Sequence, residues 1–201
     1  MGKIMIINGS PRAPKSNSKK YADIFIKNCT VPTAYFSITK NNLLEICRSI
    51  EDFTDVLLAF PLYADGIPVT LINFLKMLEK YPPRQKPKIS ILINCGFIEP
   101  EQNDIAVKMI AFFCKDQGYP FGSILRIGSG EAILTTPFKI LAEHKIKKLA
   151  SSVSKGQNVS LKVTMPIPKK IFVKASSIYW ENYGKSNGIT REQMSVMEIE
   201  K

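Results

Sequence analysis

The sequence predicts a three-layer α/β fold in which a five-stranded parallel sheet carries helices on both faces. Short apolar runs, such as residues 3–8 and 54–60, alternate with segments whose apolar residues recur at helical spacing, such as residues 69–80. Continuous apolar runs bounded by turn residues are typical of strands buried on both faces of a parallel sheet. The alternation of the two patterns therefore indicates consecutive strand–helix–strand units.

Each element of this fold has its own pattern in the sequence. Strands are expected at residues 3–8, 33–38, 54–60, 88–94 and 121–127. Helices are expected at about residues 18–28, 41–50, 69–80, 103–117 and 136–153. The third helix should end before Pro82 and Pro83, because a proline disfavours helical backbone at the residue before it. Five such strands favour the flavodoxin-like strand order, in which ligands bind at the carboxyl ends of the strands.

The pattern changes after about residue 157. A short β-like run at 159–165 meets Pro166 and Pro168, and a segment follows in which lysines alternate with aromatic residues. We therefore divide the chain into a flavodoxin-like domain at residues 1–156 and a basic, aromatic C-terminal extension at residues 157–201. We expect the aromatic residues of the extension to pack on their own domain or on a second subunit. Contact with a membrane surface or another partner is the alternative.

Composition and cysteine spacing predict a cytoplasmic protein. No apolar run approaches the roughly 20 residues that span a bilayer, and the first residues do not have the pattern of a signal peptide. The four cysteines show no Cys-x-x-Cys spacing, which argues against a zinc site or an iron–sulfur cluster and favours reduced thiols. These cysteines are Cys29, Cys47, Cys95 and Cys114.

A net charge of +11 comes from 28 basic and 17 acidic residues. The excess lies at the two ends of the chain and in the loop after the first strand. Nucleic-acid binding is one interpretation of such an excess. We favour a site for phosphorylated small molecules, because it agrees with the chemistry of that loop.

The loop after the first strand has the composition of a phosphate site. The strand ends at Asn8-Gly9-Ser10-Pro11, and Ser16-Asn17-Ser18 precedes the first helix. A serine or asparagine oxygen there can cap the helix. The free N–H groups and positive dipole end of a helix N-terminus attract phosphate. An ordinary capped strand–turn–helix connection is the alternative.

Two further loops should meet the first at the same edge of the sheet. The loop at residues 61–68 holds two prolines, a glycine and Tyr63, and the loop at residues 94–97 adds Gly96 and Phe97. Glycines allow close backbone approach, and the aromatic residues offer flat apolar faces. The isoalloxazine ring of a flavin, which is flat, mostly apolar and edged with hydrogen-bonding groups, requires a slot of this kind.

These loops carry a resemblance to a known family. The segments INGSPRAPKSNS, FPLYADGIPVTLINFLKMLEK and NCGFIEPEQND resemble the NAD(P)H-dependent FMN reductases of the flavodoxin-like superfamily, over about residues 3–153. The resemblance implies noncovalent FMN, with its phosphate held by Ser10, Arg12, Ser16, Asn17 and Ser18. It implies an isoalloxazine site formed by Pro61, Leu62, Tyr63, Ala64, Asp65, Gly66 and Ile67 on one side and by Asn94, Cys95 and Gly96 on the other. We add Phe97 to this site as the aromatic residue of the same loop.

The resemblance also implies an activity. Such enzymes pass hydride from NAD(P)H through FMN to a small acceptor, such as a quinone, a nitro or azo compound or free flavin, and they usually form homodimers with the flavin near the interface. The protein needs no catalytic side chain of its own, because the hydride chemistry belongs to the cofactor.

Residues outside these loops are assigned minor roles. His144 lies among lysines and is interpreted as a surface residue, and Cys95 as a small wall residue. The segment Gly128-Ser129-Gly130-Glu131 follows the fifth strand and is interpreted as a wall on the nicotinamide side.

Two other functions compete with the reductase hypothesis. The first is a noncatalytic electron carrier of flavodoxin type, although such carriers are generally acidic and this chain is basic. The second is a regulatory or binding module that uses the C-terminal extension.

Overall fold

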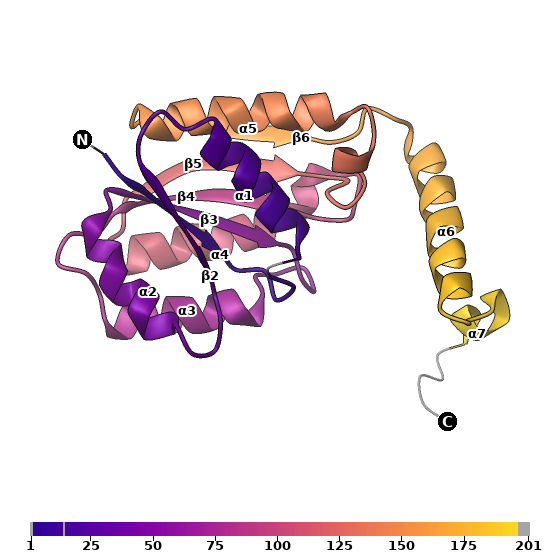
Figure 1. Ribbon diagram of the computed structural model, residues 1–201, viewed down its shortest axis with the longest axis horizontal. Coiled ribbons are helices and arrows are strands. Elements are labelled where there is room, and N and C mark those ends of the chain that lie inside the picture. Colours follow the sequence, from indigo (N-terminus) through magenta and orange to yellow (C-terminus); the bar gives the residue numbers. More distant parts are fainter. Residues whose placement is uncertain (1, 14, 197–201) are drawn as a thin grey trace. The chain divides into compact units, whose positions relative to one another are not determined.

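The computed structural model describes residues 2–13 and 15–196. The chain divides into two compact units, Met1–Met165 and Pro166–Lys201. The first unit is a parallel sheet covered by helices on both faces (Figure 1). Residues 1, 14 and 197–201 lie outside the described residues, so the end of the predicted C-terminal extension does as well.

The sheet has six strands in the order β2-β1-β3-β4-β5-β6, and every neighbouring pair is parallel. The strands are β1 (Ile4–Asn8), β2 (Thr33–Ser37), β3 (Asp55–Pro61), β4 (Lys88–Asn94), β5 (Phe121–Ile127) and β6 (Ser160–Val163). The first five follow the flavodoxin-like order that the sequence predicted. β1, β3 and β4 lie inside the sheet, so their carboxyl ends meet at one edge.

The prediction of five strands is wrong, because the run at 159–165 contributes β6. This strand pairs with β5, from Ile124 opposite Ser160 to Ile127 opposite Val163. Its residues alternate between exposed and partly or fully buried, as expected for the edge of a sheet. β1 and β3, at the centre of the sheet, are instead nearly continuous apolar runs, which is the pattern that predicted strands from the sequence.

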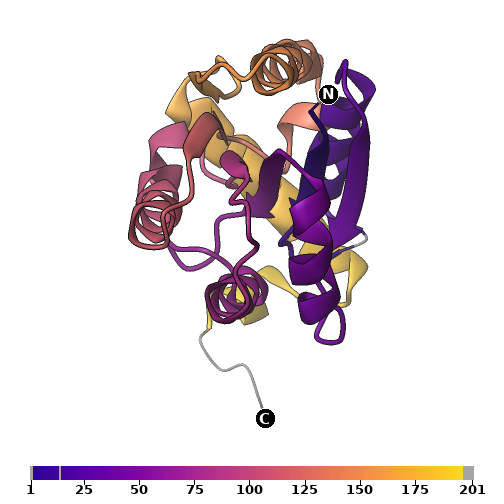
Figure 2. The ribbon, with the colours of Figure 1, turned by 90° about the vertical axis from the view of Figure 1, so that its left-hand side faces the viewer.

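Five helices cover the sheet. They are α1 (Asn17–Lys27), α2 (Leu43–Ser49), α3 (Val69–Lys80), α4 (Asp104–Asp116) and α5 (Lys139–Ser154). α1 and α5 contact each other on one face, and α2, α3 and α4 lie on the other (Figures 1 and 2). Three short 3-10 helices complete the unit, at Ile50–Asp52, Pro100–Asn103 and Ile133–Thr135.

Both faces of the sheet are sealed by buried side chains. Phe60 of β3 packs in one apolar cluster with Phe74 of α3 and Ile110 of α4. On the other face, Tyr21 and Phe25 of α1 are fully buried. The sheet is therefore a rigid platform, and the loops at its carboxyl edge start from fixed positions.

The second unit consists of α6 (Lys169–Ser186) and the short α7 (Arg191–Ser195). α6 begins directly after Pro168, whose fixed backbone angle suits a residue at a helix start. No helix was predicted there from the sequence. No described helix is long and apolar enough to cross a membrane.

Candidate functional site

A cavity of about 530 Å³ opens at the carboxyl ends of β1, β3 and β4. It is bordered by the loops that follow these strands, by the first turns of α1, and by Glu131 after β5. The lining residues are Ser10, Arg12, Lys15, Ser16, Asn17, Ser18, Lys19, Lys20, Pro61, Leu62, Tyr63, Asn94, Cys95, Gly96 and Glu131.

Asn8, the fully buried last residue of β1, fixes both ends of the first loop. Its Oδ1 accepts a hydrogen bond from the backbone N–H of Ser10 at 2.9 Å. Its Nδ2 donates to the hydroxyl of Tyr35 at 2.9 Å and to Oγ of Ser16 at 3.3 Å. The loop is thus held by specific side-chain hydrogen bonds.

Ser16 caps α1, and its Oγ accepts from the backbone N–H of Lys19 at 3.1 Å. The N–H groups of Asn17 and Ser18 belong to the first turn, where a helix offers no internal acceptor. They are directed out of the helix end, where the dipole is positive. A phosphate at this end of the cavity would accept from them.

Gly9 allows this loop to approach α3 closely. A Cβ on Gly9 would lie 3.2 Å from Cβ of Leu71, which is tighter than ordinary packing. Thr70 Oγ1 also donates to the carbonyl of Gly9 at 2.6 Å. The start of α3 therefore supports the loop after β1 at this end of the cavity.

The loop after β3 turns back on itself. Tyr63 and Gly66 exchange two backbone hydrogen bonds, of 3.1 and 2.9 Å. Ala64 and Asp65 between them both have positive φ, 44° and 57°, as a tight two-residue turn of this type requires. Left-handed backbone is costly for an alanine, so strain is stored at the tip of this loop. Tyr63 lines the cavity, and Ala64 and Asp65 do not.

The loop after β4 is tied to α1 and shapes the floor of the cavity. Ser18 Oγ donates to Oδ1 of Asn94 at 3.0 Å. A Cβ on Gly96 would meet no atom within 4 Å, so the missing side chain leaves open space in the cavity wall. A flat group could occupy that space.

Cys95 is buried, and its thiol is held by neighbours. Its Sγ accepts from Nδ2 of Asn103 at 3.3 Å, and burial raises the pKa of the thiol above its usual value. A protonated thiol is a poor nucleophile. The geometry therefore agrees with a small wall residue.

The loop after β5 places one carboxylate beside the cavity. The N–H of Gly130 donates to the carbonyl of Cys95 at 2.7 Å, and the hydroxyl of Tyr21 donates to the carbonyl of Gly130 at 2.7 Å. A Cβ on Gly130 would lie only 2.9 Å from Cβ of Asn94, so a side chain does not fit there. This clamped backbone fixes the position of Glu131.

Charge is distributed unevenly around the cavity. Four cationic side chains, Arg12, Lys15, Lys19 and Lys20, line it, and Glu131 is the one acid among the described lining residues. Lys19 is ion-paired with Asp23 and lies 4.7 Å from the ring centre of Tyr35. Such a cavity favours an anionic ligand that also carries hydroxyl or other donor groups toward Glu131.

The cavity contains eleven of the residues that the sequence analysis selected, which are Ser10, Arg12, Ser16, Asn17, Ser18, Pro61, Leu62, Tyr63, Asn94, Cys95 and Gly96. It leaves out five others, Ala64, Asp65, Gly66, Ile67 and Phe97. The tight turn places Ala64, Asp65 and Gly66 outside the lining of the cavity. Ile67 is buried and Phe97 is about half exposed.

Four lining residues were not selected as cofactor ligands: Lys15, Lys19, Lys20 and Glu131. The lysines lie within four residues of the Ser16 cap, so the predicted helix start could have indicated them. Glu131 was noted only as a wall residue. His144 is exposed on α5, and residues 2–13 and 15–196 hold no cluster of metal ligands.

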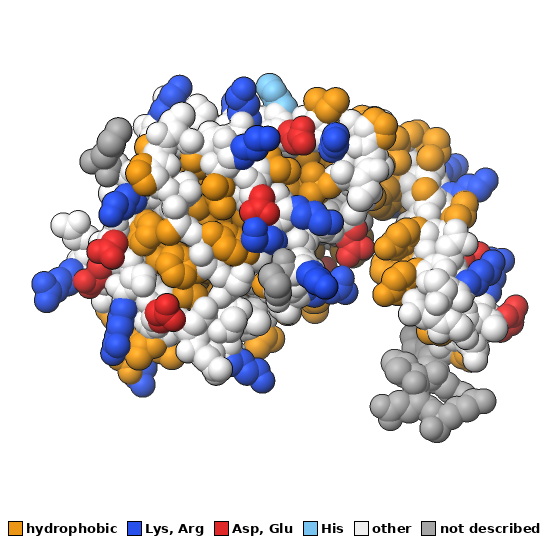
Figure 3. Space-filling view, in the orientation of Figure 1, with side chains coloured by type: hydrophobic (Ala, Val, Ile, Leu, Met, Phe, Trp, Pro, Cys, Tyr) orange, Lys and Arg blue, Asp and Glu red, His pale blue; other side chains and the backbone are white. Residues whose placement is uncertain are grey.

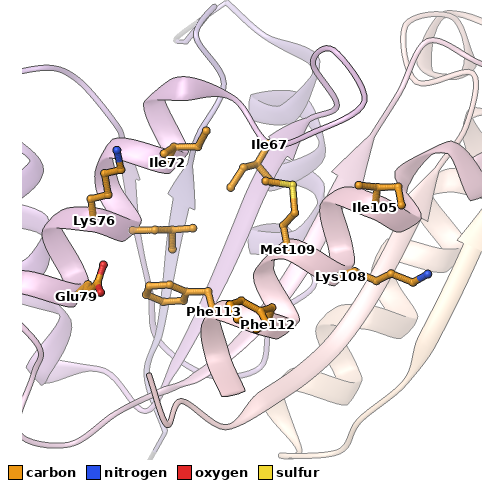
Figure 4. Close-up of a pocket in the computed structure, with 10 residues that line it drawn as sticks. Ile67, Ile72, Lys76, Glu79, Ile105, Lys108, Met109, Phe112 and Phe113 are labelled. Atoms are coloured by element: carbon orange, nitrogen blue, oxygen red, sulfur yellow. The ribbon is translucent and has the colours of Figure 1, made fainter. Parts of the chain in front are cut away.

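A second, mostly apolar groove of about 500 Å³ lies between α3 and α4 (Figure 4). Ile67 and Met109 lie close together in it, and Phe112 and Phe113 border it (Figure 4). Lys76, Glu79 and Lys108 are its charged lining residues. Its wall offers an apolar surface and no arrangement of nucleophile and base.

No protein-family model matches the sequence, and no curated protein matches it. Solved structures do match. An NAD(P)H:quinone oxidoreductase from Methanothermobacter marburgensis is similar with a TM-score of 0.62 and 10% identity, over 76% of this chain and 96% of that one. An FMN-dependent NADH-azoreductase from Bacillus anthracis, solved in complex with FMN, has a TM-score of 0.59 and 16% identity, over 77% and 100%.

The chain also matches part of a longer protein. Rubredoxin oxygen:oxidoreductase from Desulfovibrio gigas is similar with a TM-score of 0.61 and 13% identity, over 78% of this chain but only 36% of that one. Likeness at these identities shows the fold. The chain has a flavodoxin-like α/β fold, and its structural relatives include quinone reductases and azoreductases of the kind that the sequence resemblance indicated.

Proposed function

We propose that this protein is an FMN-dependent NAD(P)H oxidoreductase that delivers electrons to a small acceptor. The cavity at the strand ends carries the proposal. It combines a capped helix N-terminus and four cationic side chains with an open glycine-bearing wall and the aromatic ring of Tyr63. These features match, in one cavity, the phosphate and the flat ring of FMN.

The donor set fits the phosphate of FMN. Ser10, Asn17 and Ser18 and the side chain of Arg12 would hold it, with Ser16 keeping the helix end in place. A phosphate dianion is stabilised both by N–H groups at a helix end and by the guanidinium. Because Asn8 already fixes the loop, little ordering is required when the ligand binds.

The other end fits the isoalloxazine. Tyr63 and Leu62 offer apolar contact to one side of the ring, and the open space at Gly96 admits its edge. Backbone groups of these loops would bind the polar edge of the ring. The carboxylate of Glu131 would accept hydrogen bonds from hydroxyls of the ribityl chain.

The bound flavin would supply the hydride chemistry. The chain's residues position it, exclude water and leave one side open for the nicotinamide and then for the acceptor. A quinone, a nitro or azo compound, or free flavin is the acceptor class that we propose. The structural relatives support this choice, since they include quinone reductases and azoreductases.

Assays of nicotinamide consumption test the proposal. With FMN present, NADH or NADPH should be oxidised faster when menadione, an azo dye or excess free FMN is added. The alternative is a noncatalytic carrier of flavodoxin type, which would bind FMN but show no direct reduction by either nicotinamide. The net charge of +11 favours the enzyme, because such carriers are generally acidic.

We also propose a cytoplasmic homodimer with the flavin near the subunit interface. The four cysteines are free thiols, as expected in a reducing compartment. The apolar groove between α3 and α4, with Phe112 and Ile105 exposed beside it, offers a surface for a second subunit. Light scattering of the purified protein tests the proposed homodimer. A mass equal to that of one chain would contradict it.

A further inference from the structure

The helix α6 has two unlike sides. At about 100° per residue, Lys170, Lys174, Ser177 and Lys185 fall on one narrow stripe together with Glu181. Apolar and aromatic side chains occupy most of the remaining circumference, which is more than half of the helix. They are Ile171, Phe172, Val173, Ala175, Ile178, Tyr179, Trp180 and Tyr183, and the polar residues Lys169, Ser176, Asn182 and Ser186 fall among them.

The short helix α7 packs against the polar side of α6. Arg191 of α7 pairs with Glu181 at 3.3 Å. Met194 lies over Gly184, where an added Cβ would come within 2.6 Å of its sulfur. Of the described residues of α6, only Gly184 is buried. Within this unit, α7 therefore leaves the aromatic side of α6 uncovered.

Three aromatic rings form a cluster on that side. Tyr179 and Trp180 meet edge to face with ring centres 5.2 Å apart, and Tyr183 lies 5.9 Å from Trp180. All three side chains are exposed, as are Ile171 and Ile178. Figure 3 shows hydrophobic side chains, in orange, on the surface of this helix. Tryptophan and tyrosine combine an apolar ring with a polar group, so they favour the boundary between water and lipid.

The charge of the second unit matches an anionic surface. Residues 166–196 contain five basic residues and two acidic ones, a net charge of +3. Glu181, the one acid of α6, is already paired with Arg191. The lysine stripe lies opposite the apolar side. Because the lysine side chains are long, they can bend along the helix so that their ammonium groups reach the lipid headgroups.

From these observations we propose that α6 binds the surface of an anionic phospholipid bilayer, lying in the interface with its aromatic side in the lipid. A groove on a protein partner covers a narrow apolar stripe of a helix. The apolar side of α6 is much wider, and its rings have polar tips, which suits a planar interface. The inference goes beyond the proposed function and does not depend on flavin binding.

Trp180 makes the test direct, because it is the single tryptophan of the chain. The full-length protein is mixed with vesicles of phosphatidylcholine alone or with phosphatidylglycerol added. We expect the tryptophan emission to shift to shorter wavelength and the protein to sediment with the vesicles only when phosphatidylglycerol is present. Added salt should reverse both effects.

Matched variants separate the two sides of α6. Tyr179→Glu places a carboxylate on the aromatic side and should abolish sedimentation. Ser177→Glu adds the same charge on the lysine stripe and should retain most of it. The triple variant Lys170→Gln, Lys174→Gln and Lys185→Gln should weaken binding by about fivefold for each lysine removed. Unchanged circular dichroism confirms that each variant is folded.

Three outcomes overturn the proposal. One is no vesicle binding by the full-length chain. A second is an emission maximum that is already at short wavelength without lipid and does not move, which means that protein covers Trp180, either the same chain or a second copy. The third is equal loss of binding in Tyr179→Glu and Ser177→Glu. Failure to bind FMN has no bearing on any of them.

Discussion

The loops after β1 and β3 enter the same cavity, but they are built differently. The first is held by side chains: Asn8 bonds to Ser10, Ser16 and Tyr35, and Ser18 bonds to Asn94. The second is held by its own backbone, through the turn between Tyr63 and Gly66. Polar residues in the sequence therefore identify the lining of the first loop. In the second, turn geometry decides which side chains reach the cavity.

Because the two loops are built differently, they should bind different parts of the ligand. The first loop should recognise the phosphate of FMN, and the second should recognise the ring. Riboflavin, which lacks the phosphate, distinguishes these roles. Variants of the first loop should affect FMN alone, and variants of the second should affect both flavins.

The largest effect is expected for Ser16→Glu. The new carboxylate repels the phosphate and displaces charge-assisted hydrogen bonds of about 1.5–3 kcal/mol each. FMN affinity should fall by roughly 100-fold or more, and riboflavin affinity should change little. Fluorescence titration measures the affinities of both flavins.

Asn17→Asp adds a charge without removing the cap and should lower FMN affinity by roughly tenfold. Unchanged FMN affinity in both variants would contradict the claim that the loop after β1 binds the phosphate of FMN.

Tyr63→Ala should have a smaller effect that is common to both flavins. Loss of the aromatic contact costs about 1 kcal/mol beyond the buried area, so FMN and riboflavin should both weaken by about tenfold. Tyr63→Phe keeps the ring and serves as the control. A loss confined to FMN would place Tyr63 at the phosphate end instead.

Ala64→Gly tests the strained turn. Left-handed backbone costs alanine about 1–2 kcal/mol, and glycine loses part of that gain through the greater entropy of its unfolded chain. The free energy of unfolding should rise by about 0.5 kcal/mol in urea denaturation. FMN affinity should not change, because Ala64 lies outside the cavity. A large loss of affinity would mean that the tip of the turn contacts the ligand.

The smallest effect separates two neighbouring lysines. Lys20 and Lys19 both line the cavity, but Lys19 is paired with Asp23. Lys20→Gln should weaken FMN binding by about twofold at low salt, as for other exposed charges. Lys19→Gln should have less effect. The reverse order would show that Lys19 exchanges Asp23 for the phosphate.

The sequence predicted most of the fold, because the central strands are long apolar runs and the helices have clear periodicity. Residues 69–80, 88–94 and 121–127 form α3, β4 and β5 with the predicted bounds. The β-like run that forms β6 was placed outside the predicted sheet, because an edge strand alternates polar and apolar residues and lacks a continuous apolar run. α6 was missed because lysines and aromatic residues obscure its helical spacing.

The lining of the candidate site was predictable where local chemistry determines position. The Ser16 cap and the strand end at Asn8 place the first loop, and Gly96 lies two residues after the end of β4. The outward turn at Ala64 and Asp65 depends on positive φ angles, which are rare for alanine even though aspartate adopts them more readily than most residues. The position of Glu131 depends on contacts with Tyr21 and Cys95, which lie far from it in the sequence.

The most direct test is the visible absorption spectrum of the protein titrated with FMN and then given NADPH or NADH without oxygen. The proposal predicts a flavin band that shifts and sharpens on binding and bleaches when nicotinamide is added. Binding without bleaching by either nicotinamide would contradict the enzyme and support a carrier. No change on adding FMN would contradict the flavin site itself, and the loop after β1 would then be only a well-capped turn.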